Sequence, residues 1–440
     1  MDITNYLNQE YSDAALYINF RNTAGIDGLK NAARKVVYTI RKRNIKEPLK
    51  VSNLGSEVAK EAAYLHGEAG IQGTIVTIAK SYCGANNLPV LEGVGSFGTR
   101  FTPDSAAPRY IFAKPADYFN ELFKPEDDIN LKYQKFEGEE IEPIYYAPTL
   151  PLLLVNGSKG VGVGFASDIL PRSVENIFKM IRAKLTGKKI KSDWLTPHWN
   201  GFRGTVSSGE GSWIVKGCLD LKGKKAIVTE VPISWTLAKY IKHLRKLKEK
   251  GLITSFADYS EDDRFKFEVK LTDEEAAKSE DLIYKDLGLI ETMSENFVTI
   301  NENNAVDEYD TARAIFEDYF KLKMQTLKAR LKSEIARLSQ EESVLSETYR
   351  FVKLVIDGKV DVRLKKAEVE KVLKSLKFTI IDKLLAMPIY SLTADKAAEL
   401  KSKWQDKTKE LEAMKKETPE SLWTKDLDTL EAKLKKLGKL

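Results

Sequence analysis

The spacing of hydrophobic residues changes twice along the chain, and it predicts three regions of different structure. Near the start, Val36, Val37 and Ile40 follow helical spacing, which predicts an amphipathic helix that ends before Pro48. Residues 51–80 are predicted to form two short helices around a turn. A helix, a turn and a helix beside another helix outline a helix-turn-helix or winged-helix module.

Residue types that interrupt helices mark the limits of these segments. Ser52 is of the type that caps a helix start, and Gly67 follows the second segment. Glycine, asparagine and proline then recur through residues 83–110, which we expect to be a loop or wing without regular structure. Loops on a rigid scaffold often carry catalytic residues.

A second region begins near residue 148, where an apolar run, a glycine-rich turn and a proline follow one another. Residues 200–305 are predicted to form a mixed sheet and helix domain. Charged and apolar side chains alternate strictly from Arg264 to Leu271, the pattern of a half-buried strand. Two more strands and one helix that ends at a glycine are predicted at KAIVTEVP (225–232), NFVTI (296–300) and TLAKYIKHLRKLKEKG (236–251).

The third region is helical. Apolar residues recur every three or four positions from Phe316 to Leu338, over about six turns, and again over residues 397–414 and 427–437. Two long helices separated by residues 346–394 predict an antiparallel coiled-coil arm with a small helical globule at its tip. The predicted fold class is therefore α+β, in several domains.

The composition is that of a folded protein, with 42% hydrophobic and 30% charged residues. No run of 18 apolar residues suggests a membrane span, and the N-terminus has no secretory pattern. The two cysteines, Cys83 and Cys218, cannot build a disulfide framework, which fits a reducing cytoplasm. With only three histidines, a His/Cys zinc site is not expected either.

The net charge of +6 is too small to indicate a nucleic-acid partner, but its distribution is uneven. Residues 30–50 contain one acid, Glu47, and eight basic residues. A basic amphipathic helix can pack on a core while it faces phosphates; the alternative is a solvated surface helix, which a charge run alone favours. The basic residues are Lys30, Arg34, Lys35, Arg41, Lys42, Arg43, Lys46 and Lys50.

Most candidate chemical sites have little support. The glycine run at residues 156–164 lacks the GK[ST] of a phosphate-binding loop and does not fit GxGxxG. The acidic residues at 126–128 and 261–263 are consecutive and lie in loop-like sequence, so we interpret them as solvated loops and not as metal ligands. No histidine lies in the sequence context of a Ser-His-Asp nucleophile.

The pair Arg109-Tyr110 remains. A tyrosine hydroxyl titrates near about 10 and is a poor nucleophile unless it is activated. A neighbouring guanidinium stabilises the phenolate and can also bind a phosphate. Attack of a tyrosine on a phosphodiester would store the bond energy in a phosphotyrosine link and allow later resealing. For an arbitrary tyrosine among the 18 present, an ordinary aromatic role is far more common, so the surrounding sequence has to decide.

Four blocks of sequence resemble, in the same order, those of type IIA DNA topoisomerases. FGTRFTPDSAAPRYIFA (97–113) resembles the active-site segment of the family, G-[NS]-F-G…D-S-A-A-x-R-Y. The resemblance covers nearly the whole chain and is to the breakage–reunion, gyrase A-like subunit. The other matching blocks are DGLKNAARKVVYTI (27–40), YLHGE (64–68) and LLLVNGSKGVGVGFASDILP (152–171), with a weaker match at TEVP (229–232).

The resemblance implies a role for each matching position. Tyr110 would be the nucleophile that forms a 5′-phosphotyrosine link on each strand, and Arg109 would stabilise the phosphate and the phenolate. His66 would contact the scissile region. Val161 stands where the family has an isoleucine that wedges between base pairs. The implied DNA-binding residues are Lys30, Arg34, Lys35, Arg21 and Lys42.

The resemblance also implies an architecture and partners. A winged-helix DNA-gate domain would occupy residues 1–147, an α/β tower domain 148–305, and a coiled-coil arm 306–440, with a dimerisation globule near 346–394. Family chemistry uses Mg²⁺ bound by acids of a Toprim fold and ATP bound by an ATPase fold, and the sequence contains neither pattern. We therefore expect a cytoplasmic homodimer on double-stranded DNA that is active only with a large partner subunit carrying both modules.

The expected reactions are relaxation and decatenation, because the chain stops after the coiled coil and no DNA-wrapping domain follows. The alternative is a non-enzymatic, architectural DNA-bending protein derived from the same fold. Four departures from the family pattern bear on DNA contact. Asn31 replaces a proline, Ala33 replaces a polar residue, Arg21 corresponds only loosely, and Val161 is smaller than isoleucine, which predicts a shallower wedge.

The positions at which the family contacts quinolone drugs, a serine and an acid after the HG pair, are occupied here by Ala69 and Gly73. We predict a weak response to quinolones that bridge through those side chains. The measurement is drug-stimulated DNA cleavage. Strong stimulation at low drug concentration that does not depend on these two residues would contradict the prediction.

Overall fold

A computed structural model of the chain describes residues 3–440, and its internal contacts separate it into two compact units. The first unit runs to Lys323 and also includes Asp426–Leu440, and the second is Met324–Lys425. Within residues 3–440 no helix has both the length and the apolar character that crossing a membrane requires.

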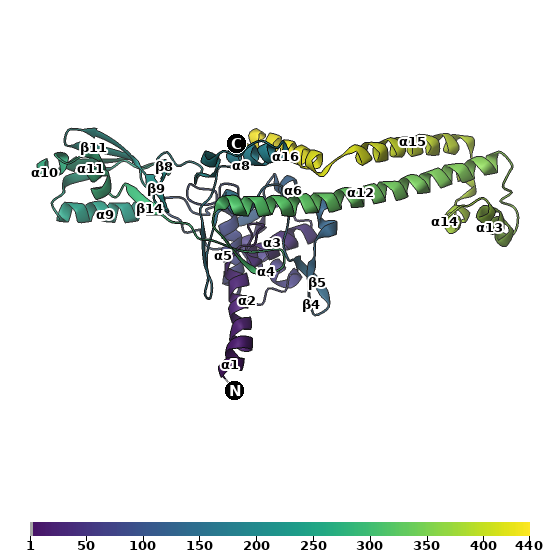
Figure 1. The fold of residues 1–440 in the computed structure, drawn as a ribbon, viewed down its shortest axis with the longest axis horizontal. Coiled ribbons are helices and arrows are strands. Elements are labelled where there is room, and N and C mark those ends of the chain that lie inside the picture. Colours follow the sequence, from purple (N-terminus) through teal and green to yellow (C-terminus); the bar gives the residue numbers. More distant parts are fainter. Residues whose placement is uncertain (1–2) are drawn as a thin grey trace. The chain divides into compact units, whose positions relative to one another are not determined.

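The N-terminal part of the first unit is mainly helical, with helices α1 to α5 labelled in Figure 1, and it also contains a small antiparallel sheet. Its elements are α1 (Ile3–Tyr6), a π-helical turn (Leu7–Tyr11), α2 (Ser12–Asn22), α3 (Asn31–Lys42), β1 (Leu49–Lys50), α4 (Val51–Glu61), α5 (Glu68–Ala79), β2 (Leu91–Val94) and β3 (Phe112–Pro115). The strand order is β1–β3–β2. Val36, Val37 and Ile40 are buried, as the helical spacing predicted.

The helix predicted to end before Pro48 is confirmed, and two other details differ from the prediction. α3 ends at Lys42, and the chain then turns at Asn44, which has a positive φ of 50°. Ser52 is not a cap, because α4 already begins at Val51 and its first N–H groups donate to carbonyls of the loop before β3. Gly67 precedes α5 as its N-cap residue and does not end a helix. Tertiary contacts have replaced the local capping that the residue types suggested.

The middle of the first unit contains two hairpins, β4–β5 and β6–β7, and several short helices. The elements are α6 (Phe119–Leu122), a 3₁₀ helix (Pro125–Asn130), β4 (Tyr133–Phe136), β5 (Glu139–Pro143), α7 (Leu152–Asn156), β6 (Ser158–Val161), β7 (Ala166–Ile169), α8 (Val174–Leu185) and a 3₁₀ helix (Ser192–Leu195). Arg182 of α8 forms ion pairs of 2.7 and 2.6 Å with Asp428 and Glu431 of α16 (Pro419–Lys436). The C-terminal end of the chain is thereby fixed to α8.

The strands predicted within residues 200–305 belong mainly to two antiparallel sheets. Their elements are β8 (Thr205–Ser208), β9 (Trp213–Lys216), β10 (Cys218–Lys222), β11 (Lys225–Glu230), α9 (Leu237–Glu249), β12 (Ile253–Asp258), β13 (Phe267–Leu271), α10 (Asp273–Ala276), α11 (Glu280–Asp286), β14 (Ile290–Met293) and the pair β15 (Phe297–Ile300) and β16 (Val306–Tyr309). The strand orders are β10–β11–β13–β12 and β14–β9–β8. Phe265, Phe267, Val269 and Leu271 are buried together, so the predicted alternation is confirmed.

The second unit consists of helices. α12 (Ala312–Ile356) enters it from the first unit, and α13 (Lys366–Ser375), α14 (Ile381–Leu385) and α15 (Ala394–Lys416) follow. α12 and α15 run antiparallel. The Tyr349 and Trp404 rings stack at 5.8 Å, and Lys407 forms an ion pair with Glu341 at 3.1 Å. α12 extends past residue 346, where the first long helix was expected to end.

The acidic segment at residues 126–128 is not the solvated loop that its composition suggested. Asp127 is buried, and its Oδ2 accepts a hydrogen bond of 2.8 Å from Lys323 Nζ. Lys323 is fully buried as well and also donates to the Ala147 carbonyl at 2.7 Å. Burial raises the pKa of Asp128 to about 6, although Arg41 lies 2.6 Å away and opposes that shift. These carboxylates tie α3 and α12 to the segment that follows α6.

We predict that Lys323→Met destabilises the protein by roughly 3–5 kcal/mol, because removing one partner leaves a buried charge uncompensated. Chemical denaturation measures the loss. Lys321→Met is the matched control: Lys321 is exposed and pairs with Asp318 at the surface, so its loss is expected to leave the denaturation midpoint almost unchanged. Equal midpoints for the two variants would contradict this role of Lys323.

Candidate active site

Arg109 and Tyr110 lie on a long loop that leaves the sheet after β2 and returns at β3. The region expected to be irregular, residues 83–110, thus contains one strand, and the rest of it is loop. The Tyr110 side chain is 71% exposed, and Arg109 is exposed beside it. Within residues 3–440 neither side chain has a hydrogen bond or an ion pair. Both functional groups are therefore available to a ligand.

The backbone of this loop is nevertheless ordered by hydrogen bonds on both of its sides. Tyr110 itself closes a turn, with its N–H donating to the Ala107 carbonyl at 2.9 Å. Three of the loop carbonyls accept hydrogen bonds from outside the loop, two from the first N–H groups of α4 and one from the Lys80 ammonium. These bonds are Val51 N to Ile111 O at 3.0 Å, Ser52 N to Pro108 O at 3.2 Å and Lys80 Nζ to Pro103 O at 2.7 Å.

His66 lies just before α5 and is half-buried. Its Nε2 and the Tyr17 hydroxyl oxygen lie 2.5 Å apart in a hydrogen bond, and the Tyr64 ring meets the imidazole edge-on at 5.5 Å. Tyr17 belongs to α2, as does Arg21, but the sequence did not mark Tyr17 as part of a site. The orientation of His66 thus depends on a residue 49 positions earlier.

A cavity of about 180 Å³ brings three of the predicted residues together, namely His66, Arg21 and Arg34. Tyr17 and Asn31 are among its other lining residues. Arg109 and Tyr110 do not line it. One chain therefore presents two separate groups of candidate residues, the cavity beside α2 and the exposed pair on the loop before β3.

Arg34 and Lys35 do not lie on the exposed face of α3, where a phosphate contact was expected. Arg34 is buried and donates from Nε to Asp27 Oδ2 at 2.9 Å and from an Nη to Oδ1 at 3.0 Å. Lys35 is buried against Glu142, with 2.8 Å between Nζ and Oε2. Their charges are compensated inside the fold, which corrects the expectation drawn from the charge run.

The other three basic candidates remain accessible to different degrees. Lys30 is half-buried and donates to the Lys159 carbonyl at 2.7 Å, and burial lowers its pKa. Lys42 is exposed, although it forms an ion pair with Glu61 at 3.2 Å. Arg21 is exposed at the mouth of the cavity. These three residues are better placed than Arg34 and Lys35 to meet an anion.

Val161 lies at the tip of the β6–β7 hairpin, with its side chain 69% exposed. The hairpin rests on α2 through two asparagines. Asn19 uses its amide oxygen and nitrogen to bind the N–H and the carbonyl of Val163, at 2.8 and 3.1 Å. Asn22 Nδ2 donates to the Val161 carbonyl at 2.9 Å. An exposed apolar side chain is thus carried on a backbone that is fixed by side-chain hydrogen bonds.

The packing of the β6–β7 hairpin against α2 explains the glycine run at residues 156–164. A Cβ at Gly160 would lie 2.2 Å from the Asn22 carbonyl oxygen, and one at Gly162 would lie 1.9 Å from Asn19 Oδ1. The glycines permit close packing of two backbones and do not form a phosphate loop. The sequence held no direct sign of Asn19 or Asn22, because their partners lie about 140 residues away.

No set of three histidine, cysteine or acidic side chains within residues 3–440 is grouped so as to bind a metal ion.

We predict that Gly160→Ala separates the β6–β7 hairpin from α2 and destabilises the protein by about 1–3 kcal/mol. Amide hydrogen exchange over residues 158–169 should rise. Gly73→Ala serves as the control, because nothing lies within 4 Å of a Cβ there and alanine favours a helix by about 1 kcal/mol over glycine. If both variants left amide exchange in the hairpin unchanged, the close packing of the hairpin on α2 would be refuted.

Comparison with known proteins identifies the family to which the chain belongs. The sequence model for the A subunits of DNA gyrase and topoisomerase IV matches residues 24–428. The chain is 30% identical to the mitochondrial DNA topoisomerase 2 of Dictyostelium discoideum, over 99% of this chain and 35% of that protein. It is 31% identical to DNA topoisomerase 2 of Trypanosoma brucei brucei, over 97% of this chain and 36% of that protein. This chain thus spans about a third of the length of these relatives.

The fold agrees with the sequence comparisons. The crystal structure of the Plasmodium falciparum topoisomerase II DNA-binding, cleavage and re-ligation domain matches with a TM-score of 0.85 at 29% identity. The match covers 98% of this chain and 64% of that one. The mixed α+β fold is therefore that of a topoisomerase II DNA-binding and cleavage domain. The chain belongs to the family of DNA gyrase and topoisomerase IV A subunits, the breakage–reunion proteins of the type IIA topoisomerases.

Proposed function

We propose that this chain is the DNA-cleaving and religating subunit of an ATP-dependent type II DNA topoisomerase. The observation that carries the proposal is the pair Arg109-Tyr110, exposed and without partners among residues 3–440 on a loop whose backbone is hydrogen-bonded on both sides. A hydroxyl that must reach a phosphodiester needs access, and one that must reseal the same bond needs a fixed position.

Tyr110 would attack the scissile phosphorus through its phenolic oxygen. The bond from phosphorus to the 3′ oxygen breaks, the phenolic proton is released, and the 3′ oxygen takes up a proton, which leaves a 5′-phosphotyrosine link. Religation reverses these steps. Arg109 would stabilise the phenolate and the charge on the phosphate. His66, held by Tyr17, would contact the scissile region. Mg²⁺ bound by a partner subunit would supply Lewis-acid stabilisation of the phosphate oxygens.

Lys30, Arg21 and Lys42 would bind the DNA backbone, and Arg34 and Lys35 would act on DNA indirectly, by holding α3. The charge of an exposed lysine or arginine near phosphates adds affinity that depends on salt. Val161 would insert between base pairs. Unstacking costs a few kcal/mol, which contacts to the bent DNA offset, and a hairpin clamped by Asn19 would lose little order on insertion.

In the proposed assembly, residues 1–147 form a winged-helix DNA gate, 148–305 a tower, and 306–440 a coiled-coil arm with its dimerisation globule near 346–394. Two copies are needed because two strands are cut. A large partner subunit would carry the Toprim and ATPase modules and so bind Mg²⁺ and ATP. We further propose that the chain is a medium subunit like that of T-even bacteriophage topoisomerases, acts in the host cytoplasm, and supports relaxation and decatenation.

The test is to mix the chain with its partner subunit, Mg²⁺, ATP and supercoiled plasmid, and to trap the reaction with detergent. Tyr110→Phe is expected to abolish covalent protein–DNA adducts, because it lacks the attacking oxygen. Arg109→Ala should lower the cleavage rate by about 100-fold or more. Tyr390→Phe is the control, since that tyrosine is 80% exposed but lies in the second unit.

Two outcomes would contradict the proposal. Equal adducts with Tyr110→Phe and the unaltered chain would place the nucleophile elsewhere. If no protein yields adducts although all bind and bend DNA, the chain is instead an architectural DNA-bending protein.

A further inference from the structure

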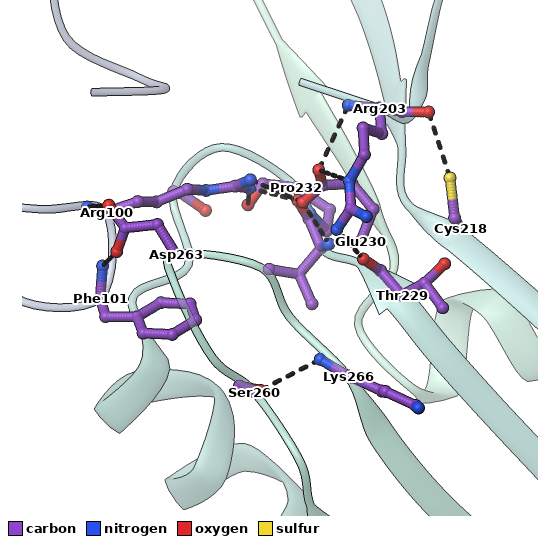
Figure 2. Close-up of polar contacts among 12 residues, drawn as sticks. Arg100, Phe101, Arg203, Cys218, Thr229, Glu230, Pro232, Ser260, Asp263 and Lys266 are labelled. Carbon is purple, nitrogen blue, oxygen red and sulfur yellow. Dashed lines mark hydrogen bonds and ion pairs between the residues drawn. The ribbon is translucent and has the colours of Figure 1, made fainter. Parts of the chain in front are cut away.

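The loop that carries Tyr110 is anchored near its midpoint in the four-stranded sheet (Figure 2). The Arg100 side chain is only 4% exposed, and its guanidinium donates to Glu230 Oε1 and to the Val231 carbonyl, at 2.6 Å each. It also lies over the Phe265 ring, 4.8 Å from the centroid. Arg100 of the loop thus occupies a buried, charged site formed by Glu230 and Val231 at the end of β11.

A second contact binds the backbone of the same segment. Asp263 accepts the N–H of Arg100 on one carboxylate oxygen, at 3.1 Å, and the N–H of Phe101 on the other, at 3.2 Å (Figure 2). The Phe101 ring meets Phe265 edge-on at 4.9 Å. Asp263 was expected to lie in a solvated acidic loop, but it is half-buried, while its neighbours Glu261 and Asp262 are exposed. One carboxylate therefore chelates two successive amides of the nucleophile loop.

The turn that presents Asp263 is conformationally costly. Glu261 and Arg264 pair across it, and the two residues between them, Asp262 and Asp263, have φ values of 49° and 58°. Two central residues with positive φ are the pattern of a type I′ hairpin turn, which asparagine and glycine normally occupy. A residue other than glycine in this region costs of order 1 kcal/mol or more. At position 263 the side chain is needed, because it binds the loop.

The anchor is itself held in place. Glu230 Oε1 accepts from both Arg100 and the Val231 N–H, and its Oε2 accepts from the Arg203 N–H at 3.2 Å. Glu230 is 1% exposed, and a charge so deeply buried is tolerable only when it is paired and hydrogen-bonded. The sheet thus provides a binding site, already held in place by its own hydrogen bonds, for residues 100 and 101.

The position of Tyr110 depends on this binding site for residues 100 and 101, because backbone hydrogen bonds within the loop link the two. Thr99 donates its N–H to the Thr102 carbonyl at 2.8 Å, and Ala106 donates to the Ser96 carbonyl at 2.9 Å, so the two halves of the loop are bonded together. The turn that contains Tyr110 follows directly. A shift at residue 100 is thus passed to the nucleophile through hydrogen bonds and not through a free linker.

We infer that Arg100 and Asp263 are positioning residues, through which the four-stranded sheet sets the place of Tyr110 against the scissile phosphate. The inference rests on the proposed function. Neither residue touches the reacting atoms. Misplacement of a reacting group by about 1 Å can lower a rate by about 100-fold, so the contribution belongs to the rate of cleavage and not to the affinity for DNA.

The test compares two substitutions in one turn. Asp263→Gly and Asp262→Gly each remove one carboxylate and each place a glycine at a positive φ, but only the first removes the bonds to the loop. Amide hydrogen exchange of residues 97–113 is measured on the chain alone. The rate of adduct formation at saturating DNA, and the affinity for DNA, are measured with the partner subunit.

We expect Asp263→Gly to raise exchange at residues 97–113 and to lower the rate of adduct formation by about 10- to 100-fold, with DNA affinity unchanged. Asp262→Gly should do neither. Asp263→Asn retains one acceptor oxygen and should fall between them, a graded rescue that loss of folding would not produce.

The inference is overturned if the two glycine variants behave alike in exchange and in cleavage, or if Asp263→Gly weakens DNA binding without affecting the rate. If the unaltered chain forms no adduct but Asp263→Gly still raises exchange, the anchor stands and the proposed function fails. The two ideas can therefore fail separately.

Discussion

The cavity beside α2, which His66 helps to line, depends on one buried carboxylate, that of Asp27, because it holds Arg34 in the cavity wall. This carboxylate is fully buried and accepts hydrogen bonds from the Arg34 guanidinium and from the N–H groups of Leu29 and Tyr146. The next residue, Gly28, has a φ of 79° and packs so tightly that a Cβ would lie 2.3 Å from the nitrogen of Leu153. An unpaired charge here would cost several kcal/mol. The start of α3, its neighbour α7 and the segment after β5 are therefore held together.

Periodicity predicted the long helices and the half-buried strand at residues 264–271, because in these elements buried and exposed positions alternate at a regular spacing in the local sequence. The strand ending at Leu271 and the helix ending before Gly251 follow their patterns closely. Charge runs were less informative. Whether Arg34 or Lys35 faces solvent depends on a partner such as Glu142, 107 residues from Lys35, and no local pattern contains that information.

In the candidate site too, some features could be predicted from the local sequence and others depend on distant parts of the chain. The pair Arg109-Tyr110 could be recognised from sequence blocks, and its exposure agrees with a nucleophile. The groups that hold it could not, because Asp263 looks like one acid among several and becomes specific only when the sheet folds. The hairpin with Val161 is similar: its glycines were visible, and the asparagines beneath them were not. In both cases an exposed candidate side chain is carried on a backbone that is fixed by residues from elsewhere in the chain.

If Tyr110 is the nucleophile, this residue on its anchored loop becomes covalently attached to DNA during cleavage. The most direct measurement is mass spectrometry of the trapped complex, formed with Mg²⁺ and the partner subunit, then digested with protease and nuclease. We predict a peptide within residues 97–113 that carries a nucleotide joined through its 5′ phosphate to Tyr110. A nucleotide on any other residue, or a 3′ linkage, would contradict the account.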